Sequence, residues 1–263
     1  MEKIKVVVHG AAGRVGQEVV KAVSAETDMQ IVGAVDVKAS STELALPDSS
    51  KIPYSKDFKA MLSSVKPDVV VDFSIAKASM PAVRIAAEMG VSLVIGTTGF
   101  SADELTEMEK LAKAKKIGII IASNFALGAV LMIHLAKIAG KFMDHAEIIE
   151  MHHDKKLDAP SGTAKSTAQA MVAARGKNFM PPSALGEASP SRGVNSGEIS
   201  IHAVRLPGLM AHQEVIFGAA GQTLTIRHDT INRECYMPGV LLAIKEAAKR
   251  KGYTYGLDKL LGL

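Results

Sequence analysis

A glycine-rich turn near the N-terminus restricts what this chain can fold into more than any other feature. It consists of Gly10-Ala11-Ala12-Gly13-Arg14-Val15-Gly16. The turn follows an apolar run at residues 4–8, which predicts a strand, and it opens an amphipathic segment at 14–24, which predicts a helix. Glycines at such a turn let the backbone approach a pyrophosphate, and the N–H groups of the helix N-terminus meet its negative charge. The arrangement predicts dinucleotide binding rather than a merely structural turn.

An acidic residue after the next predicted strand supports this prediction. Asp36 follows the apolar run at 30–35 and lies 20 residues past Gly16, where a carboxylate can accept hydrogen bonds from an adenine ribose. A carboxylate there favours NADH, because it repels the 2′-phosphate of NADPH. Arg14 and Lys38 are close in sequence, however, and either could pair with that phosphate. We therefore expect NADH, NADPH or both as cofactor.

The first half of the chain alternates short apolar runs with helical stretches, which predicts βαβ units and a parallel sheet. Strands are predicted at 4–8, 30–35, 69–73, 92–95 and 117–122, and helices at 14–24, 77–89 and 102–114. Ser101 and Glu104 predict a capping box at the start of the last helix. Residues 39–55, rich in serine with two prolines, are expected to form a loop.

The pattern changes after Asn124, where a second unit is expected. A long helix through residue 141 precedes an extended segment at 146–152 and a helix at 162–175. Residues 176–197 have no periodicity and predict a long exposed loop. Three strand-like runs at 198–205, 212–218 and 222–228 lack intervening helices, so antiparallel pairing is expected. A helix at 237–251, with Pro238 in its first turn, could return to the first domain.

Composition narrows the class of protein. The chain of 263 residues is 48% hydrophobic and 22% charged, which suits packed domains and excludes a disordered chain. Its net charge of +4 comes with only 4% aromatic residues and no tryptophan, so nucleic acid is a weak candidate partner, and a small anionic substrate explains the charge as well. The single Cys235 forms no internal disulfide or Cys/His metal finger, which favours a cytoplasmic protein without a structural metal.

Neither export nor membrane insertion is expected. The start of the sequence has none of the features of a secretory signal. The apolar stretch at 125–138 is interrupted by His134 and Lys137 and is shorter than the roughly 20 residues that a bilayer requires. We interpret it as a buried helix.

Two further loops follow predicted strands of the first domain. They consist of Gly96-Thr97-Thr98-Gly99 and Ala122-Ser123-Asn124-Phe125. Ligands of open α/β sheets bind outside the carboxyl ends of the strands, so we expect these loops and the glycine-rich turn to converge on one crevice, with the nicotinamide end near these two. Either loop by itself could be an ordinary turn or helix cap.

The densest group of titratable side chains lies in EMHHDKKLDAPSGTA, residues 150–164. His152 can donate a proton near neutral pH, and Lys156 can hold a positive charge against a carboxylate or a developing anion. Ser161 has the character of an N-cap, which places the N–H groups of Gly162 and Thr163 at a helix N-terminus that can bind an anion. The alternative is a solvated loop followed by a capped helix.

Three stretches together, VHGAAGRVGQ, VIGTTGF and EMHHDKKLDAPSGTA, resemble 4-hydroxy-tetrahydrodipicolinate reductases of bacterial lysine biosynthesis. The resemblance covers essentially the whole chain. It implies an α/β fold in which a Rossmann-type domain, residues 1–125 and 233–263, carries an inserted α+β substrate and oligomerisation domain, residues 126–232. It also implies reduction of 4-hydroxy-tetrahydrodipicolinate to tetrahydrodipicolinate, with loss of water, by NADH or NADPH.

The resemblance assigns roles to individual residues. His152 and Lys156 correspond to the catalytic, proton-donor positions. His153, Ser161, Gly162 and Thr163 correspond to residues that bind a small dicarboxylate substrate. The dinucleotide-binding positions are Gly10, Ala11, Ala12, Gly13, Arg14, Val15, Asp36, Lys38, Gly96, Thr97, Thr98, Ala122, Ser123, Asn124 and Phe125. The resemblance further implies a homotetramer assembled through the substrate domain, without a nucleic-acid or membrane partner.

Other functions compete with this one. A semialdehyde dehydrogenase shares the two-domain plan but needs a cysteine nucleophile between the domains, which this chain lacks. A sugar dehydrogenase would be expected to show Glu-Lys-Pro after the nicotinamide loop, where Gly99-Phe100-Ser101 stands. A non-catalytic dinucleotide sensor would not need His152 and Lys156. Arg205, Arg227, His228 and Arg233 are interpreted as part of a solvated face.

Overall fold

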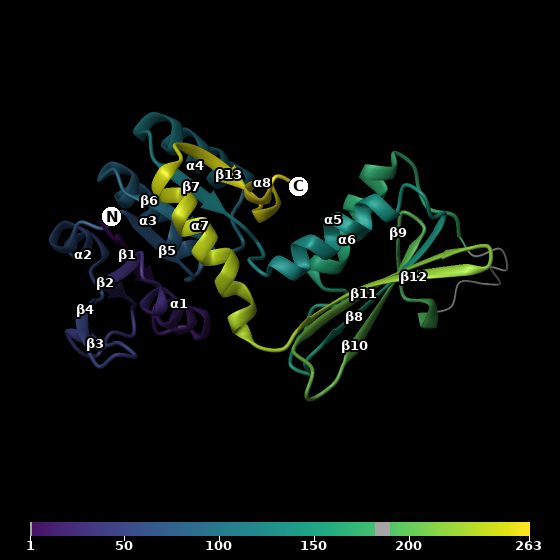
Figure 1. Cartoon of the computed structure of the whole chain (residues 1–263), viewed down its shortest axis with the longest axis horizontal. Coiled ribbons are helices and arrows are strands. Elements are labelled where there is room, and N and C mark those ends of the chain that lie inside the picture. The colour runs from purple at the N-terminus through teal and green to yellow at the C-terminus, as the bar shows by residue number, and fades with distance from the viewer. Residues whose placement is uncertain (1, 182–189) are drawn as a thin grey trace. The chain divides into compact units, whose positions relative to one another are not determined.

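The computed structural model describes residues 2–181 and 190–263. These residues form two compact units (Figure 1). Unit 1 comprises Met1–Leu127 and Arg233–Leu263, and unit 2 comprises Gly128–Asn232. Within the described residues, no helix is long and apolar enough to cross a membrane.

Unit 1 is built on an eight-stranded sheet. Its strand order is β13-β7-β6-β5-β1-β2-β4-β3, and every neighbouring pair is parallel except β3 and β4. The strands are β1 (Ile4–His9), β2 (Met29–Val35), β3 (Glu43–Ala45), β4 (Lys51–Ser55), β5 (Val69–Asp72), β6 (Ser92–Ile95), β7 (Gly118–Ile121) and β13 (Gly252–Tyr255). Strands β5 and β7 are buried at every position, because helices cover both faces of the sheet.

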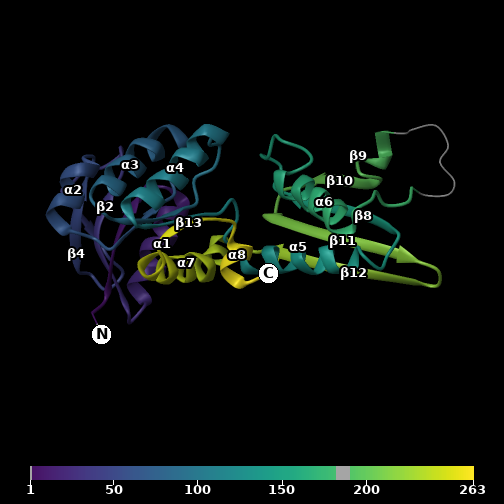
Figure 2. The same cartoon turned by 90° about the horizontal axis from the view of Figure 1, so that it is seen from above.

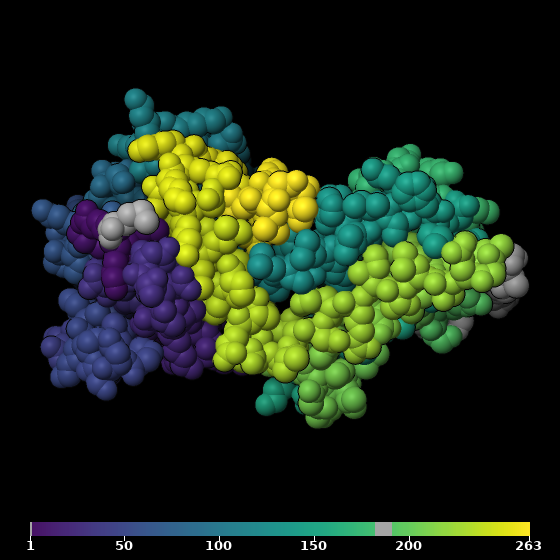
Figure 3. Space-filling model, viewed as in Figure 1, coloured from purple at the N-terminus to yellow at the C-terminus, as the bar shows by residue number. Residues whose placement is uncertain are grey.

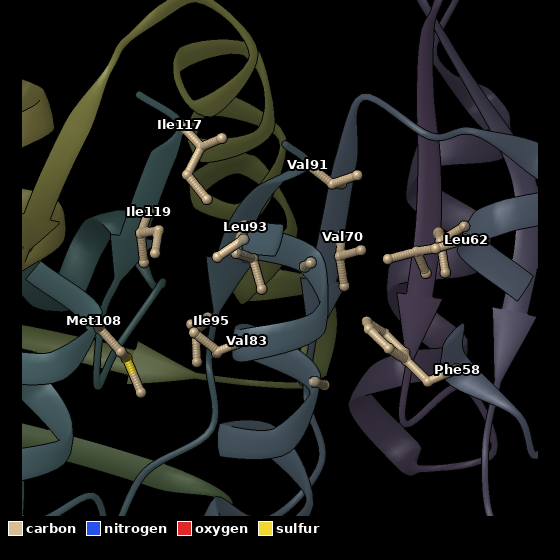
Figure 4. Close-up of a cluster of buried hydrophobic side chains, with 14 of the residues drawn as sticks. Phe58, Leu62, Val70, Val83, Val91, Leu93, Ile95, Met108, Ile117 and Ile119 are labelled. Atoms are coloured by element: carbon tan, nitrogen blue, oxygen red, sulfur yellow. The ribbon is translucent and has the colours of Figure 1, made fainter. Parts of the chain in front are cut away.

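The helices of unit 1 lie on both sides of this sheet (Figure 2). They are α1 (Arg14–Ala25), α2 (Phe58–Val65), α3 (Ala76–Glu88), α4 (Ala102–Lys115), α7 (Met237–Lys249), preceded by the short turn η2 (Arg233–Tyr236), and α8 (Leu257–Leu261). Helices α2, α3 and α4 enclose one apolar core, with Leu62, Val83 and Met108 against Val70, Leu93 and Ile95 of the strands (Figure 4). Helix α7, yellow in Figure 3, covers the opposite face together with α1. The predicted capping box of Ser101 and Glu104 is confirmed at α4.

Unit 2 contains a five-stranded mixed sheet in the order β12-β11-β8-β10-β9. Its elements are α5 (Leu127–Ala139), β8 (His145–His152), α6 (Gly162–Arg175), η1 (Pro190–Arg192), β9 (Val194–Ser196), β10 (Ile199–Arg205), β11 (Ala211–Ala219) and β12 (Gln222–Thr230). Both helices contribute to one apolar core, in which Met132 of α5 and Met171 of α6 join Ile148 and Phe217 of the sheet. The sheet thus has one face covered by helices.

Three predictions for this unit were incomplete or wrong. Strands β11 and β12 pair antiparallel, as predicted, but β10 does not join them, because β8 lies between β10 and β11 and is parallel to β10. The predicted loop at 176–197 contains β9, although residues 182–189 lie outside the described part of the chain. The predicted buried helix keeps one apolar side at the surface, where Leu131, Leu135 and Ile138 are exposed.

Two predictions for unit 1 also need correction. Residues 39–55 are not only loop, because β3 and β4 form an antiparallel pair that extends the sheet beyond β2. Pro53 fits there because a short strand near the sheet edge tolerates a residue without an N–H donor. The C-terminal helix ends at Lys249, and the chain then adds β13 beside β7.

Candidate functional site

The glycine-rich turn of unit 1 leaves no room for side chains at two of its glycines. Gly10 has a φ of +82°, and a side chain there would place its Cβ 2.6 Å from the carbonyl oxygen of Phe73. A Cβ on Gly16 would overlap the carbonyl oxygen of Gly10. Gly13 caps α1 without a side-chain hydrogen bond to the first turn. The N–H groups at the start of α1 are therefore suited to an anion.

Asp36 lies directly after β2 and faces this turn. Its Oδ2 accepts a hydrogen bond from the backbone N–H of Ala12 at 2.9 Å, and its Oδ1 accepts one from the N–H of Lys38 at 2.9 Å. A carboxylate oxygen has two lone pairs, so each oxygen keeps capacity for a ribose hydroxyl. The Lys38 and Arg14 side chains are exposed. The carboxylate therefore both braces the turn and fits the predicted ribose contact.

Phe73 connects the other two predicted loops to this turn. Its ring would overlap a Cβ on Gly96, and it lies 5.7 Å, centroid to centroid, from the ring of Phe125. Its carbonyl oxygen lies against Gly10. The loops after β1, β5, β6 and β7 therefore meet at one edge of the sheet. No role was predicted for Phe73 from the sequence, although an aromatic side chain at the end of a central strand was a usable signal.

The remaining residues predicted to bind dinucleotide differ in exposure. Ala11, Thr97, Ala122 and Phe125 are buried, whereas Thr98 and Ser123 are exposed. Val15, Ala12 and Asn124 are half-buried. Asn124 accepts a hydrogen bond through its Oδ1 from the N–H of Ala126 at 2.8 Å, which fixes the loop after β7.

In unit 2, a buried carboxylate organises the segment 150–164. The Glu150 side chain is fully buried on β8, and its Oε2 lies 2.6 Å from Nδ1 of His152. Arg205 donates to both carboxylate oxygens, each at 2.7 Å, and the N–H of Ser161 donates to Oε1 at 2.9 Å. Burial raises the pKa of Glu150, but the hydrogen bonds from Arg205 and His152 outweigh it, and the net direction is downward. Glu150 is therefore an anion.

This anion fixes the proton on one nitrogen of His152. A carboxylate only accepts hydrogen bonds, so Nδ1 of His152 carries hydrogen and Nε2 is the nitrogen that gains and loses a proton. Burial lowers the pKa of His152, and the nearby charges of Lys156 and Arg205 lower it further. The hydrogen bond to Glu150 raises this pKa, but the net shift is downward. The imidazole is thus oriented and able to exchange a proton through Nε2.

Lys156 and the following loop are held in place by two interactions. The Lys156 ammonium donates to both oxygens of Asp158, at 2.7 and 2.8 Å. The Arg205 guanidinium donates to the carbonyl oxygens of Lys156, at 3.2 Å, and Asp158, at 2.7 Å. The Lys156 ammonium thus already forms an ion pair with a carboxylate, so carboxylates are groups that this side chain can bind.

The start of α6 forms the other side of this segment. Ser161 caps the helix, as predicted, because its Oγ accepts a hydrogen bond from the N–H of Ala164 at 3.1 Å. The space beside Gly162 is open, because a Cβ there would have no described atom within 4 Å beyond its own helix and chain neighbours. Gly162 and Thr163 therefore present first-turn N–H groups that an anion can reach. His153 is half-buried, and its carbonyl oxygen accepts a hydrogen bond from the N–H of Lys156 at 3.1 Å.

Two residues of this cluster were not predicted correctly from the sequence. Glu150 was missed, although residues i and i+2 of a strand share a face, so Glu150 and His152 could have been paired from their spacing. Arg205 was interpreted as part of a solvated face, which is wrong, because its side chain is only 19% exposed and forms an ion pair with a fully buried carboxylate. Only the pairing of β10 with β8, which puts Arg205 opposite His152, brings it to this segment.

Models of one protein family match both units of the chain. The family model described as dihydrodipicolinate reductase, N-terminus, matches residues 4–125, and the model for the C-terminus matches residues 128–261. The chain is 61% identical to the 4-hydroxy-tetrahydrodipicolinate reductase of Dehalococcoides mccartyi, over 100% of both chains. It is 46% identical to the enzyme of the same name from Moorella thermoacetica, over 98% of both.

A solved structure is similar along nearly the full length. The dipicolinate-bound dihydrodipicolinate reductase from Paenisporosarcina sp. TG-14 is 38% identical, with a TM-score of 0.88, and the alignment covers 98% of this chain and 99% of that one. Both family models and these full-length relatives indicate the same family. The chain belongs to the dihydrodipicolinate reductase family.

Proposed function

We propose that this chain reduces 4-hydroxy-tetrahydrodipicolinate to tetrahydrodipicolinate with NADH or NADPH, in the diaminopimelate route to lysine. The observation that carries the proposal is the histidine oriented by Glu150, in the same short segment as Lys156 and the open N-terminus of α6. Relatives that match the whole chain carry the name of this reductase. One hydride and one proton enter the substrate, and one water leaves.

The residues of unit 1 fit a nicotinamide dinucleotide. The Gly10–Gly16 turn and the start of α1 would hold the pyrophosphate, and Asp36 would accept hydrogen bonds from the adenine ribose. When bound, the reduced dinucleotide supplies the hydride. Arg14 and Lys38 carry positive charge beside Asp36, which supports use of NADPH as well as NADH. We expect NADH to bind more tightly, because the carboxylate repels a 2′-phosphate.

The residues of unit 2 fit a small dicarboxylate. The N–H groups of Gly162 and Thr163, the capping loop of Ser161 and the His153 side chain would bind the carboxylates. Lys156 would exchange its Asp158 partner for a substrate carboxylate, because both are the same chemical group. Holding the substrate in one orientation can lower the barrier by several kcal/mol.

His152 would then donate the proton. Hydride addition to an electron-poor ring carbon conjugated with an imine leaves negative charge on the substrate. Nε2 of the protonated His152 can neutralise that charge, while Glu150 stabilises the imidazolium through Nδ1. The loss of a proton from His152 should therefore lower activity at alkaline pH.

We also propose that unit 2 assembles the protein into a homotetramer in the cytoplasm. Strand β12 ends the sheet, and most of its residues are exposed, Leu224 among them. An exposed sheet edge is usually covered by another strand or chain. Light scattering after gel filtration would give the mass, and a monomer at micromolar concentration would contradict this assembly.

A steady-state assay tests the proposed reaction. The purified protein is given enzymatically generated substrate with NADH or NADPH, and oxidation of the dinucleotide is followed by absorbance. We expect turnover with both, and a loss of about 10²-fold or more in His152→Ala and Lys156→Ala with dinucleotide binding retained. Absence of substrate-dependent oxidation, or full activity of His152→Ala, would contradict the proposal.

A further inference from the structure

A fully buried carboxylate lies among the dinucleotide loops of unit 1. Asp72, the last residue of β5, is fully buried. Its Oδ2 lies 3.0 Å from Nδ1 of His9, and its Oδ1 accepts hydrogen bonds from the Ser74 N–H at 2.8 Å, the Ser74 hydroxyl at 2.7 Å and the Thr97 hydroxyl at 2.8 Å. None of the dinucleotide contacts proposed above involves this side chain.

The partners of Asp72 lie at or just beyond the ends of three strands. His9 directly precedes Gly10, Ser74 directly follows Phe73, and Thr97 lies in the second glycine-rich loop. The Ser74 N–H also donates to the Thr97 hydroxyl at 2.9 Å. One carboxylate therefore ties together the ends of β1, β5 and β6, which carry the loops that meet at Phe73.

The Thr97 hydroxyl is used inside the protein. It donates its hydrogen to Asp72 and accepts one from Ser74, and Thr97 is only 4% exposed. A hydroxyl has a single hydrogen to donate, so Thr97 has none left for a ligand. Any hydrogen bond that Thr97 donates to a dinucleotide then comes from its backbone.

Asp72 is charged despite its burial. Burial raises its pKa, but the hydrogen bonds from His9 and Ser74 and the electrostatic interaction with His9 lower it, and the net direction is downward. A buried anion is tolerated only when its partners are held in good geometry. The hydrogen bonds that stabilise the Asp72 anion therefore also hold the three loops in place.

We propose that Asp72 is a positioning residue for dinucleotide binding, which acts through Thr97, Ser74 and His9 to preset the three loops. The proposal rests on the proposed function, because it assumes that these loops bind NADH or NADPH. Loops held in the binding conformation before the ligand arrives lose less entropy on binding. Loosening them should therefore weaken binding without removing a ligand contact.

The sharpest test removes the Thr97 hydroxyl. Thr97→Val keeps the shape of the side chain. The matched control is Thr106→Val, on the exposed side of α4. The Thr106 hydroxyl donates only within its own helix, to the Ala102 carbonyl oxygen. The dissociation constants of NADH and NADPH are measured by titration, together with the melting temperature and both KM values. Asp72→Asn is measured in parallel where it folds.

We expect Thr97→Val to weaken dinucleotide binding about three- to tenfold, the equivalent of one hydrogen bond, and to raise the KM for the dinucleotide but not that for the substrate. A purely structural role would lower the melting temperature and leave the affinity of the folded protein unchanged. Equal affinities of wild type and Thr97→Val would overturn this inference and leave the proposed function intact. A wild-type protein that bound neither dinucleotide would overturn both.

Discussion

Replacing Glu150 by glutamine tests how the proposed proton donor is controlled. The carboxylate accepts four hydrogen bonds, from His152, from two nitrogens of Arg205 and from the Ser161 N–H. Glutamine has nearly the same shape but only one acceptor oxygen. Whichever way its amide is turned, the NH₂ group faces two of these donors. At least two hydrogen bonds are lost, and the Arg205 charge loses its partner.

The size of the effect follows from these contacts. Breaking a buried ion pair by removing one charge costs about 3–5 kcal/mol of stability. A well-placed proton donor contributes about 10²–10⁴-fold to the rate, which is the upper limit for a residue that acts only through His152. We expect kcat to fall about 10–10²-fold. In a His152→Ala background, Glu150→Gln should have little further effect on the rate.

The pH profile distinguishes positioning from simple loss of structure. Glu150 raises the pKa of His152 against the effects of burial and of Lys156 and Arg205. Without the carboxylate this pKa falls further, so His152 loses its proton at lower pH. The alkaline limb of kcat/KM should therefore move to lower pH in Glu150→Gln.

A matched control lies on the same strand. Glu147→Gln removes a carboxylate that also contacts a histidine, His202 at 3.0 Å, but on the opposite face of β8. We expect its pH profile to match that of the wild type. A Glu150→Gln enzyme with an unmoved alkaline limb would refute the assignment of Glu150 as the residue that sets the proton affinity of His152.

Three further substitutions give separate tests. Asp158→Asn should lower the substrate KM in steady-state assays, because it removes the carboxylate that competes with the substrate for Lys156. The decrease should be a few-fold at most, because an exposed ion pair is weak. An increase in KM would contradict this competition. Asp36→Ala should reduce the preference for NADH over NADPH in parallel binding titrations, and an unchanged preference would end its assignment to the ribose. Leu93→Ala should destabilise the protein by about 2–5 kcal/mol in chemical denaturation, because Leu93 is fully buried in the core of unit 1; a loss below about 1 kcal/mol would contradict the packing.

Local sequence patterns predicted much of the fold. The strand–turn–helix at the N-terminus, the capping box at Ser101 and the cap at Ser161 each depend on residues within a few positions of one another. Their backbone conformations and hydrogen bonds are set by neighbours in the chain. Sequence alone could therefore place the glycine-rich turn before a helix, and His152 and Lys156 beside the start of another.

Contacts between residues that are far apart in the sequence could not be predicted from local sequence patterns. Arg205 lies 55 residues from Glu150, and Thr97 lies 25 residues from Asp72. Neither pair has a sequence pattern, because the order of strands in a sheet determines which residues meet. The prediction that the late strands simply pair with one another missed the central position of β8 for the same reason.

The sequence by itself indicated the kind of chemistry, because a glycine-rich turn, a histidine, a lysine and a helix cap can be recognised from residues that are close together in the chain. The tertiary structure alone decided which of those groups are oriented and charged. A carboxylate such as Glu150 or Asp72 stays ionised when buried only if hydrogen-bond donors surround it, and folding brings donors such as Arg205 and Thr97 to it from distant parts of the chain.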